Sequence, residues 1–217
     1  FSATNTMRFA QQLYEGLDIG EGGSVGLITY MRTDSVTIAK EAQEAALNFI
    51  RQTYGAEYCP ARPNYFKNKA AAQEAHEAIR PTDVNRTPEM VAPYLEPELL
   101  KLYTLIWRRF TASQMAPCVQ NLTTVDVGVA GADRHEYTFR ATATVPVFPG
   151  FTKVYGDETK RKDDSVEAEI LGALRERDQL AIAHADKEQK FTEPPPRYTE
   201  AMLVKAMEEL GIGRPST

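Results

Sequence analysis

Two stretches decide the fold class of this chain, Thr124-Val-Asp-Val-Gly-Val129 and Glu136-Tyr-Thr-Phe-Arg-Ala-Thr-Ala-Thr-Val145. In both, apolar residues alternate with polar ones, which is typical of a strand with one buried face. Turn-forming residues lie between them, in Gly131-Ala-Asp-Arg134. The pattern therefore predicts two antiparallel strands joined as a hairpin.

Upstream of Pro117 the apolar residues instead recur three and four positions apart, as they do on one face of a helix. Helices are predicted at the N-terminus, after about residue 34, and from Glu98 to Gln114. Their expected buried stripes are Met7, Ala10, Tyr14 and Leu17 in the first, Ile38, Ala42, Ala45 and Phe49 in the second, and Leu99, Leu102, Ile106 and Phe110 in the third. Asp34 or Ser35 is expected to cap the second helix.

Four further expectations concern the rest of the chain. A strand ends near Tyr30, since Val25–Tyr30 is short, apolar and β-prone. A helix over Ala70–Ile79 ends before Pro81, because the residue before a proline disfavours the helical region. Downstream, Gly156–Ser165 reads as a charged loop and Leu180–Phe191 as another strand.

The C-terminal segment begins with a stiff connector, Pro194-Pro-Pro196. Thr199 is expected to cap a last helix that turns Leu203, Met207 and Leu210 inward and ends at Gly211. The fold class is thus α+β, with a helical domain at residues 1–116, a β-rich domain at 117–190, and the start of another helical domain at 191–217.

Composition limits the partners of the chain. It has 25 basic and 30 acidic residues, a formal net charge of −5. Compact DNA binders that ignore sequence usually carry a basic excess, because phosphate contacts supply most of their affinity. The balance therefore argues against DNA binding as a property of the whole chain, but it leaves room for a local basic groove.

The cysteines and the termini give further limits. Cys59 and Cys118 lack the clustered spacing of a zinc site, and so few cysteines favour a reduced, cytosolic protein. No apolar run approaches the roughly 18 residues of a membrane helix, and no signal peptide is visible. The chain begins with Phe1 and ends on Gly211-Ile-Gly-Arg-Pro-Ser-Thr217, so it is expected to be an internal piece of a longer protein.

Tyr30 and Arg32 form the first candidate site. In an extended stretch, residues two apart share a face, so Arg32 is expected beside Tyr30. A phenol with a pKa of about 10 is a poor nucleophile, and a nearby cation favours the phenolate. A guanidinium also binds two phosphate oxygens at once. The pair suits attack on a phosphodiester, although the chain has ten tyrosines and most tyrosines serve in packing.

Gln73-Glu-Ala-His-Glu-Ala-Ile-Arg-Pro81 is the second candidate. If this stretch is helical, His76 and Arg80 lie four residues apart on one face and both could meet a phosphate. A solvated helix face of mixed charge explains the same spacing. The loop from Cys59 to Lys69 mixes basic with aromatic residues, as single-strand binding needs, but many loops share this composition.

Together these segments resemble the bacterial type IA DNA topoisomerases. The resemblance rests on Leu27-Ile-Thr-Tyr-Met-Arg-Thr-Asp-Ser35, Gln73–Pro81, Leu102-Tyr-Thr-Leu-Ile-Trp-Arg-Arg-Phe110 and Tyr198–Thr217, which occur in the family's order. It covers essentially the whole chain, and four motifs in order are far more specific than any one of them.

The resemblance implies an enzyme that cuts one DNA strand without ATP, passes another strand through the gap and reseals it, relaxing negative supercoils. Tyr30 would be the nucleophile that becomes linked to a 5′ phosphate, and Arg32 would position that phosphate. Thr33, His76, Arg80 and Arg214 would contact DNA, and a structural role is the alternative for Arg80. The family's fold is a torus, in which residues 117–190 would form part of a β-rich arch.

The resemblance also implies partners and a cofactor. The partners would be single-stranded or negatively supercoiled DNA and the remaining domains of a longer parent chain, in the bacterial cytoplasm with the nucleoid and without a membrane. The family's Mg²⁺ site uses acidic residues of a domain that has no counterpart here, so this chain alone is expected to be inactive. A non-catalytic DNA-binding or hinge module is the alternative, and an α+β protein that never meets DNA is a third.

Overall fold

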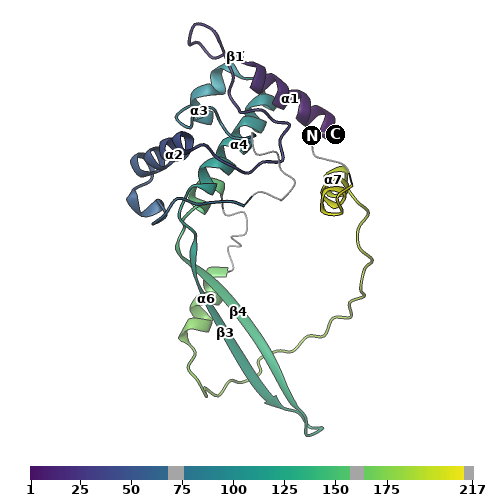
Figure 1. Ribbon diagram of the computed structural model, residues 1–217. Coiled ribbons are helices and arrows are strands. Elements are labelled where there is room, and N and C mark those ends of the chain that lie inside the picture. Colours follow the sequence, from purple (N-terminus) through teal and green to yellow (C-terminus); the bar gives the residue numbers. More distant parts are fainter. Residues whose placement is uncertain (68–75, 157–163, 213–217) are drawn as a thin grey trace. The chain divides into compact units, whose positions relative to one another are not determined.

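The computed structural model describes residues 1–67, 76–156 and 164–212, without the side chains of 164–167. It divides the chain into two compact units. Unit 1 consists of Phe1–Pro117, Gly150–Tyr155 and Arg197–Thr217, and unit 2 of Cys118–Pro149 and Gly156–Pro196. Helices make up most of unit 1 and the strand hairpin dominates unit 2 (Figure 1), which is the α+β class expected from the two hydrophobic periods.

Helices α1 and α4 pack against each other in unit 1 (Figure 1). The helical elements of this unit are α1 (Ala3–Glu15), α2 (Lys40–Thr53), η1 (Ala56–Tyr58), α3 (Pro88–Val91), η2 (Ala92–Tyr94), α4 (Pro97–Ser113), α5 (Thr152–Tyr155) and α7 (Glu200–Glu209). The prediction for α4 was right to within one residue at each end. Its stripe of Leu99, Leu102 and Phe110 is buried, and Ile106 is packed against the same core.

Two predicted stripes were partly wrong. In α1 the core takes Ala10 and Leu13, whereas Met7 and Tyr14 stay exposed. In α2 the buried residues are Ala46 and Ile50, one position beyond the predicted Ala45 and Phe49. α1 packs on α4, and α2 packs on η1 with Phe49 against Trp107. Which face of a helix is buried depends on such neighbours, and sequence spacing alone does not specify them.

The start of α2 was also predicted wrongly. The helix begins at Lys40 rather than after Asp34 or Ser35. The backbone N–H of Ser35 donates to Thr33 Oγ1 at 3.0 Å, and the N–H of Thr37 donates to Ser35 Oγ at 3.1 Å. Such short side-chain to backbone bonds compete with helix formation, and the segment between Tyr30 and Lys40 is not helical.

Between α1 and Tyr30 the chain folds back on itself. Gly16 ends α1 with φ of 114°, and β1 (Leu17–Asp18) pairs antiparallel with β2 (Ser24–Val25). The expected strand over Val25–Tyr30 is therefore only a short β2 followed by an isolated bridge between Ile28 and Pro81. This return brings Leu27 and Ile28, both fully buried, back against the end of α1.

Unit 2 is built on one long hairpin. Strands β3 (Val119–Ala130) and β4 (Glu136–Phe148) are antiparallel, with Val125 opposite Ala141 and Val127 opposite Phe139. The hairpin prediction is confirmed. Opposed residues share a face, so the alternating valines of β3 lie on one side and the Asp126–Arg140 ion pair, with 2.7 Å between Oδ1 and Nε, lies on the other.

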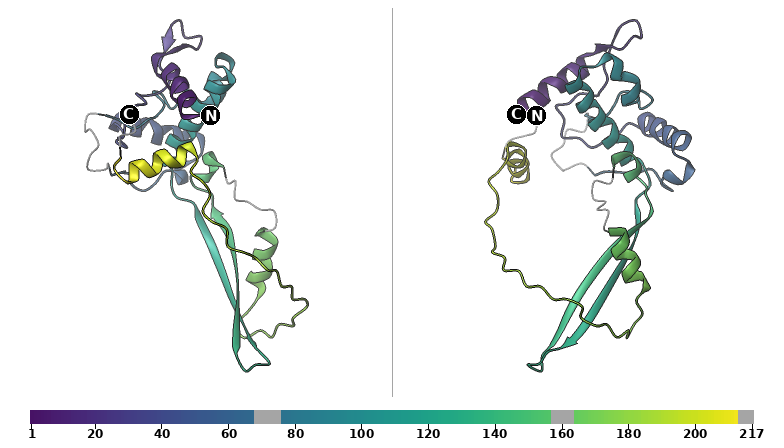
Figure 2. Two further views of the ribbon diagram at one scale, coloured as in Figure 1. Left: turned by 90° about the vertical axis from the view of Figure 1, so that its right-hand side faces the viewer. Right: turned by 180° about the vertical axis from the view of Figure 1, so that it is seen from behind.

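A helix, α6 (Asp164–Ala173), lies along this hairpin in both views of Figure 2 and contacts β4. It begins within the segment read as a charged loop; residues 157–163 lie outside the described part of the chain. The predicted strand at Leu180–Phe191 was wrong, since these residues adopt no strand. Two alternating apolar residues do not hold a strand unless a neighbouring strand supplies its ladder hydrogen bonds.

The last helix, α7, begins as predicted. Thr199 is its N-cap, and the Thr199 hydroxyl accepts a hydrogen bond from the N–H of Met202 at 3.2 Å. Gly211, with φ of 70°, follows the helix end. The predicted burial of Leu203, Met207 and Leu210 was wrong, because all three are exposed. None of the helices that the structure describes is long and apolar enough to cross a membrane.

Candidate active site around Tyr30

Tyr30 follows a segment that is hydrogen-bonded to a second one, 50 residues further along the chain. The N–H of Thr29 donates to the carbonyl of Arg80 at 2.9 Å, and the N–H of Thr82 donates to the carbonyl of Leu27 at 3.0 Å. With the bridge between Ile28 and Pro81, these bonds align the two segments antiparallel. Two of the motifs found in the sequence are thereby brought together.

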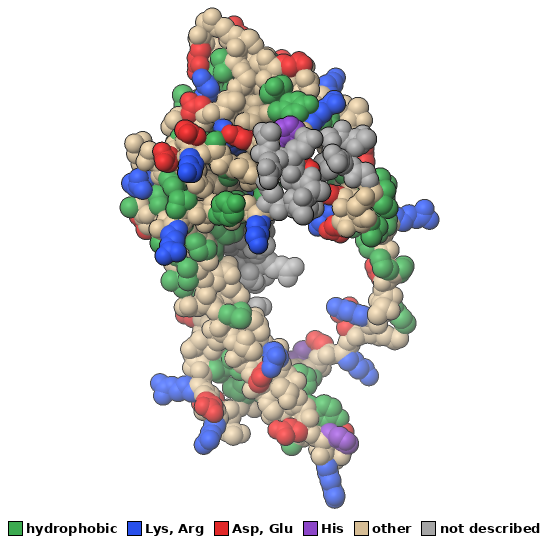
Figure 3. Space-filling model, viewed as in Figure 1, with side chains coloured by type: hydrophobic (Ala, Val, Ile, Leu, Met, Phe, Trp, Pro, Cys, Tyr) green, Lys and Arg blue, Asp and Glu red, His purple; other side chains and the backbone are tan. Residues whose placement is uncertain are grey.

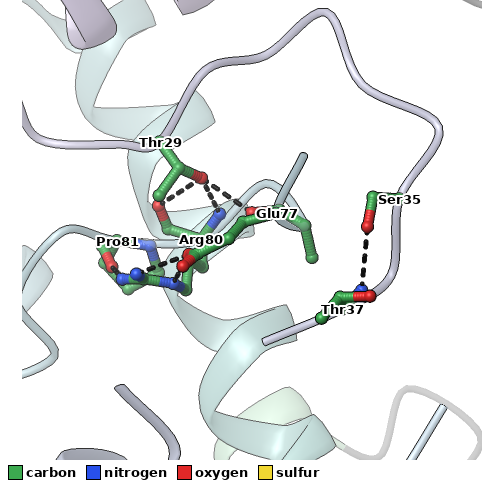
Figure 4. Close-up of polar contacts among 7 residues, drawn as sticks. Thr29, Ser35, Thr37, Glu77, Arg80 and Pro81 are labelled. Atoms are coloured by element: carbon green, nitrogen blue, oxygen red, sulfur yellow. Dashed lines mark hydrogen bonds and ion pairs between the residues drawn. The ribbon is translucent and has the colours of Figure 1, made fainter. Parts of the chain in front are cut away.

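The Thr29 side chain strengthens this link (Figure 4). Its hydroxyl donates to the carbonyl of Ala78 at 2.7 Å and accepts from the N–H of Arg80 at 2.9 Å. Further along, the N–H of Ala78 donates to the carbonyl of Thr37 at 2.8 Å. The residues before Pro81 are therefore held in extended contact with the Tyr30 segment, and the predicted helix was wrong for His76–Ile79. Residues 70–75 of that prediction lie outside the described residues.

Arg80 turns inward instead of facing an open surface. Its side chain is only 12% exposed. Nε donates to Glu77 Oε2 at 2.8 Å, and Nη1 donates to the carbonyl of Pro81 at 3.0 Å. Figure 4 shows the guanidinium folded between Glu77 and Pro81. With its donors so engaged, Arg80 is better placed to hold this segment in shape than to meet a phosphate.

Tyr30 itself is 42% exposed, and its ring lies between two other aromatic rings. The ring centroids are 5.3 Å apart for Tyr14 and Tyr30 and 6.3 Å apart for Tyr30 and His76, both edge to face. A pocket of about 430 Å³ opens here; its lining comprises Tyr14, Gly26, Ile28, Thr29, Tyr30, Thr33, His76, Glu77 and Thr82. A reactive phenol in such a pocket is accessible to a ligand and still held by its neighbours.

The other predicted site residues are placed as follows. Thr33 lines the pocket with Tyr30 and His76. Arg32 is exposed, two residues beyond Tyr30, and Met31 between them is buried, but the chain bends at residues 31–32. Arg32 is absent from the described lining of the pocket, and Arg80 lines a different pocket beside α2. Arg214 lies outside the described residues.

The loop of aromatic and basic residues that precedes the second motif is held by hydrogen bonds to α2 and to the end of α4. The Asn64 side chain donates to the carbonyls of Ser113 at 2.8 Å and Met115 at 3.1 Å, at the end of α4. The Gln43 side chain donates to the Asn64 carbonyl at 2.8 Å. Tyr65 follows this anchor and is 87% exposed. Lys69, at the end of the predicted loop, lies outside the described residues.

Charge on the surface of unit 1 is mixed. Figure 3 shows basic and acidic side chains intermingled on the visible face of unit 1. Among the described residues, no group of three His, Cys, Asp or Glu side chains converges as the ligands of a metal ion would.

One residue of this site, Tyr14, was not predicted from the sequence as a site residue. Tyr14 was read as part of a buried helical stripe, and its contact with Tyr30 depends on the turn at Gly16 and the short β1–β2 return. The three glycines at 20, 22 and 23 were a usable signal, since they indicate a reversal of the chain between the two tyrosines.

Comparisons with known proteins agree on one family. A family model described as DNA topoisomerase matches residues 1–217. The chain is 49% identical over 220 residues to DNA topoisomerase 1 of Xylella fastidiosa and 46% identical to that of Rickettsia bellii. These matches cover 100% of the chain but 26% and 27% of the relatives. Full-length topoisomerase I from Thermotoga maritima is similar in structure, with a TM-score of 0.73, 38% identity, and 100% and 33% coverage of the two chains.

Proposed function

Since the chain belongs to the bacterial type IA DNA topoisomerase family, we propose that it carries the tyrosine with which such an enzyme cleaves one DNA strand, Tyr30. The chain spans about a quarter of the length of the curated relatives it matches. The proposed activity is therefore that of a longer protein, and this chain supplies one side of its catalytic cleft. The observation that carries the proposal is the exposed Tyr30 ring beside His76 in a pocket.

The proposed chemistry is a transesterification. The Tyr30 oxygen attacks the phosphorus of a phosphodiester, the bond to the 3′ oxygen breaks, and the phenolic proton ends on the released 3′ hydroxyl. The 5′ phosphate is then linked to Tyr30. One ester replaces another, so resealing by the reverse step needs no ATP. Passage of a second strand while the first is open would relax negative supercoils.

Each predicted residue has a role in this proposal. Arg32, exposed beside Tyr30 in sequence, would hold the phosphate oxygens with two parallel N–H groups and offset their charge. His76 would donate to the same phosphate or the neighbouring one. Thr33, in the pocket lining, would contact the DNA backbone. Arg214 would contact DNA further along, and Arg80 would hold the segment of His76.

Magnesium and the remaining partners also belong to the proposal. Mg²⁺ would be held by residues outside this chain, where it would offset phosphate charge when bound. The substrate would be single-stranded or negatively supercoiled DNA, and the partner would be the rest of the parent protein in the bacterial cytoplasm, associated with the nucleoid. The net charge of −5 fits a piece whose DNA affinity depends on groups elsewhere.

The test is a denaturing gel of the full-length protein with end-labelled single-stranded DNA, with Tyr30→Phe beside the parent. We expect a covalent adduct on the 5′ side of the break that disappears with Phe, while non-covalent DNA binding persists. Tyr94→Phe, which changes another exposed tyrosine of unit 1, is the matched control and should keep the adduct. An adduct that survives Tyr30→Phe would move the chemistry elsewhere, and the absence of any adduct from a folded parent would favour a binding or hinge module.

A further inference from the structure

Tyr14 lines the Tyr30 pocket, although the helical spacing of α1 predicts that it is buried in the core. It lies in the last turn of α1, where the core takes Leu13 and leaves Tyr14 40% exposed. A large aromatic ring that is not used for the core gains little stability from burial. Its ring instead packs against that of Tyr30, at 5.3 Å between centroids and 63° between planes.

The backbone around Tyr14 is tied directly to the Tyr30 segment. The N–H of Leu27 donates to the carbonyl of Leu13 at 2.7 Å, across the end of α1. Gly26 lies so close that a Cβ added to it would be 2.8 Å from the carbonyl oxygen of Tyr14, nearer than real Cβ atoms approach backbone. Both contacts occur within four residues of Tyr30, so they hold the backbone of Tyr14 close to the segment that leads to Tyr30.

The two ring contacts restrict the Tyr30 side chain from two directions. Tyr14 comes from α1, and His76 comes from the segment that is hydrogen-bonded to Thr29. Edge-to-face pairs at this separation add attraction beyond the area they bury, and they favour particular ring orientations. A side chain held in this way loses less rotamer freedom when it reaches an attack geometry.

We infer that Tyr14 is a positioning residue for Tyr30: its ring holds the Tyr30 phenol in the orientation from which it attacks the phosphodiester. The inference rests on the proposed function of Tyr30 and deepens it. The role is assigned to the aromatic ring of Tyr14, because the edge-to-face contact is made between the two rings. Tyr14 touches no reacting atom in this scheme, and it acts through the orientation of its neighbour.

A purely structural role for Tyr14 predicts a different result. Loss of packing lowers the fraction of folded, active protein, which reduces the amplitude of a single-turnover reaction. Loss of orientation lowers the rate constant itself in the molecules that remain active. Single-turnover cleavage of a labelled single-stranded oligonucleotide by the full-length protein separates the two, because amplitude and rate constant are measured together.

The experiment compares Tyr14→Leu, Tyr14→Phe and the parent, with Tyr94→Leu as a control at another exposed tyrosine of unit 1. Tyr14→Leu is expected to lower the rate constant of adduct formation about three- to tenfold, the size of one aromatic pair. The oligonucleotide concentration that gives half-maximal rate should not change. Tyr14→Phe keeps the ring and should restore the parent rate, and Tyr94→Leu should leave it unchanged.

Three results would overturn the inference: a parent rate constant in Tyr14→Leu, a fall in Tyr14→Phe as large as that in Tyr14→Leu, or an equal fall in Tyr94→Leu. Tyr30→Phe in the same assay keeps the two proposals apart. If Tyr30→Phe abolishes the adduct and Tyr14→Leu reacts normally, only the role of Tyr14 fails. If Tyr30→Phe still forms an adduct, the proposed nucleophile fails first.

Discussion

Unit 1 closes around a core that includes the fully buried Leu13, Leu27, Ile50 and Tyr103, whereas unit 2 exposes most of its hairpin. Among the residues of unit 2 whose side chains the structure describes, only Ala143 and Ala168 are buried. Unit 2 owes its register to the ladder of β3 and β4 and to cross-strand pairs. The Tyr30 pocket lies in unit 1, where packing and buried hydrogen bonds determine the backbone from several sides, and this is what positioning of a reactive group requires.

The largest expected effect is on the core of unit 1. Trp107 is 5% exposed, its Nε1 donates to the carbonyl of Val84 at 2.8 Å, and its ring packs on Phe49. Trp107→Ala should lower the free energy of unfolding by about 3–5 kcal/mol. Hydrogen exchange resolved along the chain would measure this loss within unit 1.

The matched change in unit 2 is Phe139→Ala, since Phe139 is 63% exposed on β4. It removes a large aromatic ring but little buried area, so its cost should stay within about 0.5 kcal/mol. A cost of Phe139→Ala similar to that of Trp107→Ala would contradict the contrast between the units.

A smaller loss of stability is expected where Gly26 approaches the backbone of Tyr14. Gly26→Ala would place a Cβ 2.8 Å from the Tyr14 carbonyl oxygen, and the end of α1 would have to move. A cost of about 1–3 kcal/mol is expected, as for other overpacked sites. Gly23→Ala is the control, because nothing lies within 4 Å of its added Cβ. If the midpoint of thermal unfolding shifted equally for both variants, the contact between Gly26 and the Tyr14 carbonyl would not be tight.

The stability of unit 1 should also fall at alkaline pH. Burial raises the pKa of the Tyr103 hydroxyl above its ordinary value of about 10, although the Arg86 charge opposes the shift. The unfolded chain therefore ionises first, so the contribution is complete below about pH 10 and is lost as pH rises further. Tyr103→Phe should make the alkaline fall in denaturant midpoint shallower. It also removes the hydrogen bond to the Arg86 carbonyl, at 2.6 Å, and so should lower stability at neutral pH.

The smallest effect is expected for the ion pair on the hairpin of unit 2. The Arg140 guanidinium holds the pKa of the Asp126 carboxyl below its usual range, but both side chains are exposed. The contribution of this ion pair to stability is present above the ordinary carboxyl pKa of about 4 and is lost as pH falls below it. Arg140→Gln and Asp126→Asn, alone and combined, should show little coupling, and less at high salt. Strong coupling at high salt would contradict this.

Local periodicity predicted what depends on neighbours in sequence. The α4 helix and the β3–β4 hairpin were correct, because each is long and has one regular period from end to end. The N-cap at Thr199 was correct because a cap is set by residues three apart. The start of α2 was missed, since Thr33 and Ser35 satisfy nearby backbone groups in turns. The strand predicted at Leu180–Phe191 was wrong, because a strand also depends on a neighbouring strand that supplies its hydrogen bonds.

The features of the candidate site also divide into those that the sequence indicates and those that only the tertiary structure decides. The sequence by itself singled out Tyr30, Arg32 and His76 as candidate site residues, through motifs whose order matches one family. Only the tertiary structure decided that Arg80 turns inward to Glu77 and that Tyr14 leaves the core to pack on Tyr30. These placements depend on backbone hydrogen bonds between residues 14 to 51 positions apart, from Leu27 to Leu13 and from Thr29 to Arg80. Such bonds form only when distant segments meet, and no local pattern encodes which segments those are.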